Sequence, residues 1–573
     1  MLKNIGFQLC KGEIMDFIKK HIEGIALFTL LLLCYVLFFY KMGNYPLIDV
    51  DETRYIAIAR DMLNANDWMT LKLNNEFFFE KPPLFFWLVN LSFLTFGQIS
   101  EAVARFPIAL CSTFAVFLMY FSGKTIVSKK YGMLSALILA TGFEYMALTR
   151  IAILDMVLTV AITTSVLLGL MTFFAKENHK KFLWWGFYTF SALAVLAKGI
   201  PGFVIPFGTL FFSYLISGKI KEIFKPIYCL PGLILFFLIT LPWHIAMMQI
   251  HGDLFYKEYV LKHHLARFVD SKDLGRKEPW FFYIIVFLVG FLPWTISLVS
   301  MFIDKTKSFF NKAKEYFSKT KYSQLQYKWD ALDNKSKFLS LNVISFFFIF
   351  LFFSSASTKL PTYILPAFVP ASFLLANYWH GFLYKEENSN KIVTSTIILH
   401  SIFIIAAIAA LFCPMFLPSE ILVEINKFRA PVVILFTIVP MIAIFSAILK
   451  QKTLTFFSHI ALMAGIMIIC ASYVFNFMCS FGQNDLIRYA QKAKSEKVKL
   501  ATFDFGRRYS IMYYYEGIID FQTENDIKWL NEYTTKNPNA YIVVKLKNMQ
   551  DLDKEFKYKT IETGKKYCLI KKK

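Results

Sequence analysis

The sequence is poor in charged residues, and its few cysteines form no recognisable pattern. Only 18% of the 573 residues are charged, against 56% that are hydrophobic, which is too apolar for a soluble protein of this size. The eight cysteines include no CxxC pair, and several lie in apolar runs, where cysteine behaves as a small hydrophobic residue. A disulfide between Cys479 and Cys568 stays open, because we expect both on the same side of a membrane.

The sequence also lacks internal repeats, low-complexity linkers and an excess of acidic residues. Forty Asp and Glu stand against 62 Lys and Arg, for a formal charge of +22. In a membrane protein such a basic excess lies mainly in cytoplasmic loops and near anionic headgroups, so the charge does not indicate nucleic-acid binding. The absence of a repeat disfavours a transporter of lipid-linked sugars, because transporters often contain inverted repeats.

Long apolar runs are abundant, and spans of ~17–25 apolar residues can cross a bilayer. The first run, 24–40, follows Lys19 and Lys20 and is followed by no small-residue cleavage site, so we interpret it as an uncleaved helix that starts in the cytoplasm. With it the runs number about thirteen, the others being 103–124, 132–148, 154–175, 183–197, 202–217, 226–247, 280–302, 339–354, 362–380, 392–414, 431–449 and 455–478. The sequence therefore predicts an integral membrane, all-α fold.

The lysines orient these helices. If the chain starts inside, the inner loops are short or Lys-rich, and the loop 304–337 alone holds nine Lys against four acids, as the positive-inside rule requires. The outer side then receives the loop 42–102, the loop 248–279 and the segment after Cys479. That segment, 481–573, alternates strand-like and helix-like runs and predicts a small α/β domain beyond the membrane region 1–480.

Unusual polar residues gather on this outer side from segments that are far apart in the sequence. Ionisable residues at a membrane edge are costly and indicate function. They lie in the first outer loop, in three outer turns and in the second large outer loop: Asp51, Glu52, Arg54, Arg60, Glu80, Lys81, Arg150, Asp155, Lys198, His263, His264, Arg267, Lys359 and Tyr363. Cations suit an anionic phosphate, while carboxylates suit a sugar hydroxyl, an amine or a metal. The combination favours a phosphate-linked sugar at a membrane surface.

Each feature also has a structural reading. Asp51 and Arg54 could form a surface ion pair, the loop from Glu80 could be a rigid end fixed by two prolines, and Arg150 and Lys198 could reach towards headgroups. Asp155 could be a helix N-terminal charge. The two histidines could be unremarkable loop residues.

The ordered motifs resemble the ArnT-like branch of the protein O-mannosyltransferase superfamily. The matching segments span most of the membrane region and include PLIDVDETRYIAIARDML (46–63), DWMTLKLNNEFFFEKPPLFFWL (67–88), ARFP (104–107), TRIAILDM (149–156), LAKGIPG (196–202), LPWH (241–244), HLARF (264–268), FLPW (291–294) and KLPTYILP (359–366). Phe78 stands where a Tyr is common in the family, and His244 where a Tyr usually follows LPW.

The resemblance implies a GT-C-type glycosyltransferase of the bacterial inner membrane, with its active site and C-terminus in the periplasm. The donor would resemble undecaprenyl phosphate carrying 4-amino-4-deoxy-L-arabinose, and the acceptor a lipid A phosphate, a modification that blunts cationic peptides such as polymyxin. The resemblance implies no organic cofactor and no nucleic-acid partner. It implies membrane lipids as partners. The oligomeric state stays open.

The same resemblance suggests roles for residues. Catalysis would fall to Asp51 and Asp155, and a divalent metal, zinc or similar, could lie between Glu80 and His264. Substrate binding would involve Glu52, Arg54, Lys81, Arg150, Lys198, Arg267, Lys359 and Tyr363. An enzyme of the same superfamily that glycosylates protein or another glycan is the alternative, and there Asp51 could act as a general base, because a hydroxyl acceptor must lose a proton.

Overall fold

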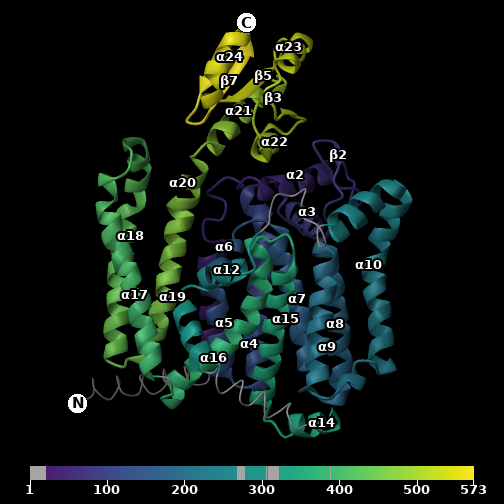
Figure 1. Ribbon diagram of the computed structural model, residues 1–573, viewed down its shortest axis with the longest axis vertical. Coiled ribbons are helices and arrows are strands. Elements are labelled where there is room, and N and C mark those ends of the chain that lie inside the picture. The colour runs from purple at the N-terminus through teal and green to yellow at the C-terminus, as the bar shows by residue number, and fades with distance from the viewer. Residues whose placement is uncertain (1–20, 267–277, 305, 307–321, 388) are drawn as a thin grey trace, which may run out of the picture.

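The structure, a computed structural model, describes residues 21–266, 278–304, 306, 322–387 and 389–573. Helices form a bundle, and a small domain with a mixed sheet caps one end of it, while the short helix α14 lies at the opposite end (Figure 1). Arg267 lies outside the described residues, as does the side chain of His264.

The described part of the chain contains eight helices that are long and apolar enough to cross a membrane, or up to nine if one bent pair counts as a single span. The bent pair, Phe282–Gly290 and Thr295–Asp304, corresponds to the predicted run 280–302. The eight are His21–Phe39, Glu101–Ile126, Leu154–Met171, Pro226–His263, Asn334–Ser355, Ser389–Met415, Ile421–Ile448 and Lys452–Cys479.

The other four predicted runs also fall on helices. One run is split between α5 (Lys129–Ala140) and α6 (Phe143–Leu148), and another falls on η5 (Pro361–Ala367) and α16 (Phe368–Lys385). The remaining two fall on α8 (Glu177–Lys198) and α9 (Ile200–Ile216). The helical membrane architecture is therefore confirmed, whereas the number thirteen stays a prediction.

The other elements of the membrane region follow in chain order. They are η1 (Tyr35–Phe39), α2 (Asp51–Asn64), β1 (Lys72–Leu73), β2 (Glu76–Phe77), α3 (Leu84–Phe96), α4 (Glu101–Ile126), α7 (Leu154–Met171), η2 (Ile220–Glu222), α10 (Pro226–Phe255), η3 (Tyr256–Ala266), α12 (Phe282–Gly290), α14 (Tyr322–Asp330), α15 (Asn334–Ser355), α17 (Ser389–Phe412), η6 (Cys413–Met415), α18 (Ser419–Ile448), α19 (Lys452–Ile469), η7 (Cys470–Val474) and α20 (Phe475–Cys479).

The C-terminal domain holds a five-stranded sheet in the order β4-β3-β5-β7-β6. β3 pairs in parallel with β4 and β5, and β7 pairs antiparallel with β5 and β6. Its elements are α21 (Gln483–Ser495), β3 (Leu500–Phe503), α22 (Tyr509–Tyr515), β4 (Asp520–Gln522), α23 (Ile527–Lys536), β5 (Tyr541–Lys545), η8 (Leu546–Asn548), α24 (Met549–Glu555), β6 (Tyr558–Thr563) and β7 (Tyr567–Lys572). The predicted α/β character is confirmed.

The disulfide considered between Cys479 and Cys568 does not form. Both cysteines are free and buried. Cys568 lies within β7, opposite Val544 of β5. It belongs to the hydrophobic core of the C-terminal domain. Cys479 ends α20 on the membrane side of the connection to that domain.

The helix α2 joins the two parts of the molecule. It lies across the end of the bundle, beneath α22 of the C-terminal domain (Figure 1). Its residues Tyr55 to Ala59 are buried against the bundle, whereas Asp51 at its start is exposed. Because successive residues of a helix point about 100° apart, Asp51 and Glu52 face different surroundings.

Candidate active site

Arg54 is the centre of the first group of predicted site residues. Its guanidinium donates to Asp51 Oδ1 at 2.8 Å and lies 3.7 Å from Glu80 Oε2. It also lies over the rings of Tyr55, at 4.9 Å, and of Tyr509 from the C-terminal domain, at 5.9 Å. Burial would lower the Arg54 pKa, but the charges around it, including those of Glu80 and Asp51, raise it. Arg54 therefore stays cationic and holds two carboxylates together.

Asp51 has the most exposed side chain of the three residues in this group. Its side chain is 55% exposed, compared with 26% for Glu80 and 17% for Arg54. An exposed carboxylate fixed by one arginine is oriented without being enclosed, so it can meet a ligand that arrives from outside.

A second group lies where α7, α8 and η5 meet. Lys198, at the end of α8, forms an ion pair with Asp155, in the first turn of α7. The Lys198 Nζ also lies 3.7 Å from the centre of the Tyr363 ring in η5. The side chains of Asp155 and Lys198 are only 13% and 10% exposed, and a pair removed from water in this way is strongly coupled.

Tyr55 belongs to the first group, where its hydroxyl accepts from Arg54 at 3.1 Å, and the sequence reasoning missed it. Burial is the main cause that raises the pKa of its phenol, and the charges of Asp51, Asp155 and Glu80 raise it further, against the lowering effect of Arg54. The charges of carboxylates from both groups therefore affect the pKa of this one buried phenol. The sequence could have indicated Tyr55, because it directly follows Arg54 in the motif at 46–63.

Two further predicted residues border this region. Lys359 is buried and its Nζ donates to the carbonyl of Glu278 at 3.2 Å. Tyr283, in α12, donates its hydroxyl to the carbonyl of Leu360, beside Lys359. Lys81 is buried next to Glu80 in the loop before α3.

Glu52 and Arg150, predicted to bind substrate, lie in a buried network of hydrogen bonds, and their substrate role stays a prediction. Both Glu52 oxygens accept from Arg105, at 2.7 and 2.8 Å, and also from the backbone N–H groups of Ile48 and Ala152. Arg150 is fully buried and donates to the carbonyls of Leu37 and Tyr40. These contacts join the first outer loop to α4 and to the turn before α7.

Glu144, in α6, is a second residue that sequence reasoning missed. It is buried, and its carboxylate has no hydrogen-bond partner among the described residues. A buried, unpaired carboxylate is costly, but no sequence motif distinguished it from an ordinary helix residue.

The metal site predicted at Glu80 and His264 is not tested by the geometry, because the His264 side chain lies outside the described residues. Within the described ranges, no three His, Cys, Asp or Glu side chains gather in a way that could hold a metal ion. Glu80 faces Arg54.

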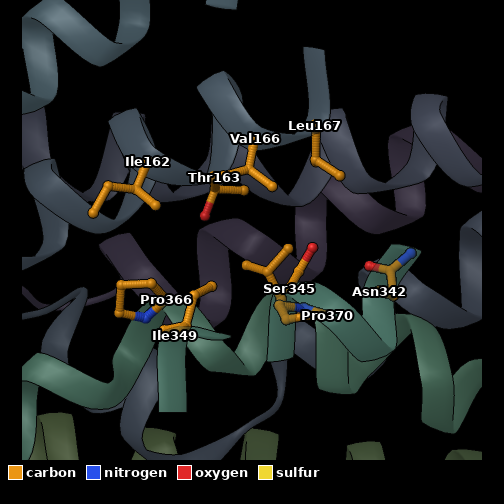
Figure 2. A pocket seen from close by; sticks show the side chains of 10 residues that line it. Ile162, Thr163, Val166, Leu167, Asn342, Ser345, Ile349, Pro366 and Pro370 are labelled. Carbon is orange, nitrogen blue, oxygen red and sulfur yellow. The ribbon is translucent and has the colours of Figure 1, made fainter. Parts of the chain in front are cut away.

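A small crevice elsewhere in the bundle contains none of these residues. It lies between α7 and the α15–α16 region and is lined mainly by apolar side chains (Figure 2). Thr163, Asn342 and Ser345 are its polar residues, and no charged group lines it. This crevice therefore lacks the charged groups that lie around Arg54 and Lys198.

Comparisons with known proteins identify relatives of this chain. Residues 25–256 match the family described as dolichyl-phosphate-mannose-protein mannosyltransferase. A protein of Aquifex aeolicus whose function is uncharacterised is 30% identical over 376 residues, which are 65% of this chain and 67% of that protein. The undecaprenyl phosphate-alpha-4-amino-4-deoxy-L-arabinose arabinosyl transferase of Yersinia enterocolitica is 27% identical over 365 residues, covering 63% of this chain and 60% of the relative.

Solved structures extend the likeness over nearly the whole chain. ArnT from Cupriavidus metallidurans in the apo state superposes with a TM-score of 0.75 at 16% identity, covering 95% of this chain and 97% of that one. The same protein bound to undecaprenyl phosphate gives a TM-score of 0.72 over the same shares. At this identity the likeness shows the fold, and it confirms the predicted membrane bundle with a small C-terminal domain. The sequence alignment spans about 60% of the length of the Yersinia transferase.

Proposed function

The chain belongs to the dolichyl-phosphate-mannose-protein mannosyltransferase family, in its ArnT-like branch, and we propose that it transfers a sugar from a polyprenyl phosphate to an acceptor at the outer face of the membrane. The donor would be undecaprenyl phosphate carrying 4-amino-4-deoxy-L-arabinose, and the acceptor a lipid A phosphate. The observation that supports this most is the geometry of two groups of predicted residues: Asp51 and Glu80 around Arg54, with the Tyr55 phenol on the same guanidinium, and the Asp155–Lys198 pair.

The reaction is a displacement at the anomeric carbon of the sugar. The bond from that carbon to the lipid phosphate oxygen breaks, a bond to an acceptor oxygen forms, and polyprenyl phosphate leaves with the bonding electron pair. Fixed cations stabilise the charge that develops on the leaving phosphate, which is usually the largest contribution to such catalysis. Lys81, Lys198 and Arg267 are the proposed cations.

The role of Asp51 depends on the acceptor. A phosphate is already ionised at neutral pH, so no base is needed, and the exposed carboxylate would orient the sugar, bind its amine or stabilise positive charge on the ring. A protein hydroxyl would have to lose a proton, and Asp51 could then accept it. The family match to protein mannosyltransferases is the observation that favours this second acceptor.

The test is mass spectrometry of lipid A from the host with and without the gene, complemented by the wild-type protein or by Asp51→Asn. A pentosamine on a lipid A phosphate that requires both the gene and Asp51 would support the first acceptor. Unchanged lipid A, together with a sugar missing from glycoproteins or surface polysaccharide, would overturn it in favour of the alternative.

A further inference from the structure

One edge of the sheet in the C-terminal domain carries a group of cations that the proposed reaction has not used. We call Arg507, Arg508, Lys545, Lys547 and Lys566 the edge cluster. The two arginines follow β3, and Lys545 ends β5, which pairs with β3 in parallel. Because the carboxyl ends of parallel strands meet at the same edge of a sheet, these segments lie together.

Lys566 joins them from the turn between β6 and β7. The backbone N–H of Leu546, next to Lys545, donates to the Lys566 carbonyl at 3.0 Å. Burial lowers the pKa of Lys545, and the charges of Lys547, Lys566 and Arg508 lower it further. The cations are therefore near enough to repel one another.

The edge cluster is accessible and is not neutralised by ion pairs. Arg507, Lys547 and Lys566 are exposed. Among the ion pairs of the described residues, none joins a member of the cluster to a carboxylate. The charge of Asp504 raises the pKa of Lys545, but the Asp504 Oδ2 already accepts a hydrogen bond from the Asn548 side chain at 2.7 Å. The local excess of positive charge can attract an anion.

This edge lies next to the segment that connects the C-terminal domain to α2. Tyr509 and Ser510 follow the two arginines directly, and they contact Arg54 in α2 and Asp49 in the loop just before it. Burial is the main cause that raises the pKa of Tyr567, which is next to Lys566. The charge of Asp49 raises this pKa further. Figure 1 shows α22 between the sheet of the C-terminal domain and α2.

We propose that the edge cluster binds the phosphate of a phosphorylated glycolipid acceptor and holds that acceptor beside α2. The proposal rests on the proposed function, because it assigns the acceptor side of the same site. In the membrane region Arg54 and Lys198 are already paired with carboxylates, whereas the edge cluster is not. Lysine and arginine are the usual partners of phosphate, and ligands of α/β domains commonly bind outside the carboxyl ends of parallel strands.

The test compares two full-length triple variants that lose the same charge. Arg507→Gln/Lys547→Gln/Lys566→Gln removes the exposed members of the cluster. Lys536→Gln/Lys557→Gln/Lys559→Gln removes three exposed lysines at the opposite edge of the sheet, near the start of β5 and β6. Binding of the purified proteins to lipid A that carries its phosphates, and to the same lipid after enzymatic dephosphorylation, is measured at low and at high salt.

We expect the cluster variant to bind phosphorylated lipid A about tenfold more weakly, because three exposed charge contacts together contribute roughly that factor. The loss should shrink at high salt, which screens exposed charges, and it should vanish for the dephosphorylated lipid. The control variant should bind like the wild type. Equal weakening by both triple variants, or none by either, would overturn the proposal, as would an equal loss of undecaprenyl phosphate binding.

Further measurements distinguish a folding defect of the triple variant from a loss of binding, and a failure of the proposed function from a failure of the edge cluster. If the triple variant unfolds at a lower temperature than the wild type, Arg507→Gln and Lys547→Gln are measured singly, each expected to weaken binding about twofold. A wild-type protein that binds phosphorylated lipid A through the cluster but does not glycosylate it would refute the proposed function and support the edge cluster. Normal transfer with an unchanged acceptor KM in the folded cluster variant would refute the edge cluster alone.

Discussion

The carboxylate of Asp49 accepts two hydrogen bonds from Ser510, from the backbone N–H at 3.0 Å and from the hydroxyl at 2.8 Å, across 461 positions of the chain. The bonds connect the loop that leads into α2 with the first turn of α22 in the C-terminal domain. Nearby, Gln483 donates to the carbonyl of Leu47, and Tyr514 accepts from the Leu47 N–H. The C-terminal domain is therefore fixed to the segment that carries Asp51.

Loss of this connection should loosen the C-terminal domain without unfolding the bundle. Ser510→Ala removes one hydroxyl donor and should reduce stability by about 1 kcal/mol. Hydrogen exchange of the α22 amides should become faster. Ser495→Ala is the matched control, because that hydroxyl donates to a nearby carbonyl at an exposed site, and it should leave α22 unchanged. Unaltered exchange in Ser510→Ala would contradict the connection.

Asp51→Asn should abolish transfer while leaving the protein folded. We expect the rate to fall at least about 100-fold, a typical effect of removing one electrostatic contact at a reacting centre. The ion pair with Arg54 is exposed on the Asp51 side, so stability should change by less than about 1 kcal/mol. Transfer and thermal unfolding are measured on the same preparation.

Asp61→Asn is the control for this substitution, since Asp61 also pairs with an arginine of α2, at 2.8 Å, and is 38% exposed. It should keep near-normal transfer. Normal turnover in Asp51→Asn would refute the catalytic role.

Lys198→Met should reduce both stability and activity. It leaves Asp155 charged and unpaired in a nearly buried position, which typically costs about 3–5 kcal/mol. In Asp155→Leu/Lys198→Met no charge is left uncompensated, so the unfolding temperature should recover while transfer stays absent. If the double variant regained activity, the pair would be structural only.

Glu52→Gln distinguishes a structural from a substrate-binding role for Glu52. Its carboxylate is fully buried with Arg105, so the loss of charge should destabilise the protein by about 3–5 kcal/mol. The folded fraction should keep the wild-type KM for donor and acceptor. A raised KM with an unchanged unfolding temperature would instead support the substrate role that the sequence predicts.

The proposed metal at Glu80 and His264 is tested by metal content as well as by activity. If these residues hold a divalent ion, the purified wild-type protein should contain about one ion per chain, and chelation or Glu80→Gln should remove it. Glu76→Gln, an exposed glutamate in β2, should keep the ion. A wild-type protein that transfers sugar without bound metal would refute the site.

The sequence alone determined the kind of protein and predicted one face of the membrane for its chemistry. Apolar runs of membrane-spanning length must form helices in a bilayer, because no water satisfies their backbone there, and the lysines predict their orientation. Asp51 and Arg54 are three positions apart, so one helix brings them together, and their ion pair is present at 2.8 Å. The C-terminal strands β3, β5 and β7 were predictable from their β-branched and aromatic runs, whereas the short β4 and the charged β6 were not.

Only the tertiary structure decided which polar residues are available to a ligand. Asp51 and Glu52 are adjacent in the sequence, yet one is largely exposed and the other fully buried with Arg105, 53 positions away. Arg150 likewise has its carbonyl partners more than a hundred positions away. Burial and long-range partners depend on how helices pack, and no local pattern encodes them. For the same reason the pairing of β3 with β5 was needed to bring the segments of the edge cluster together, and the contacts of α22 with the start of α2 and the loop before it were needed to bring that edge near α2.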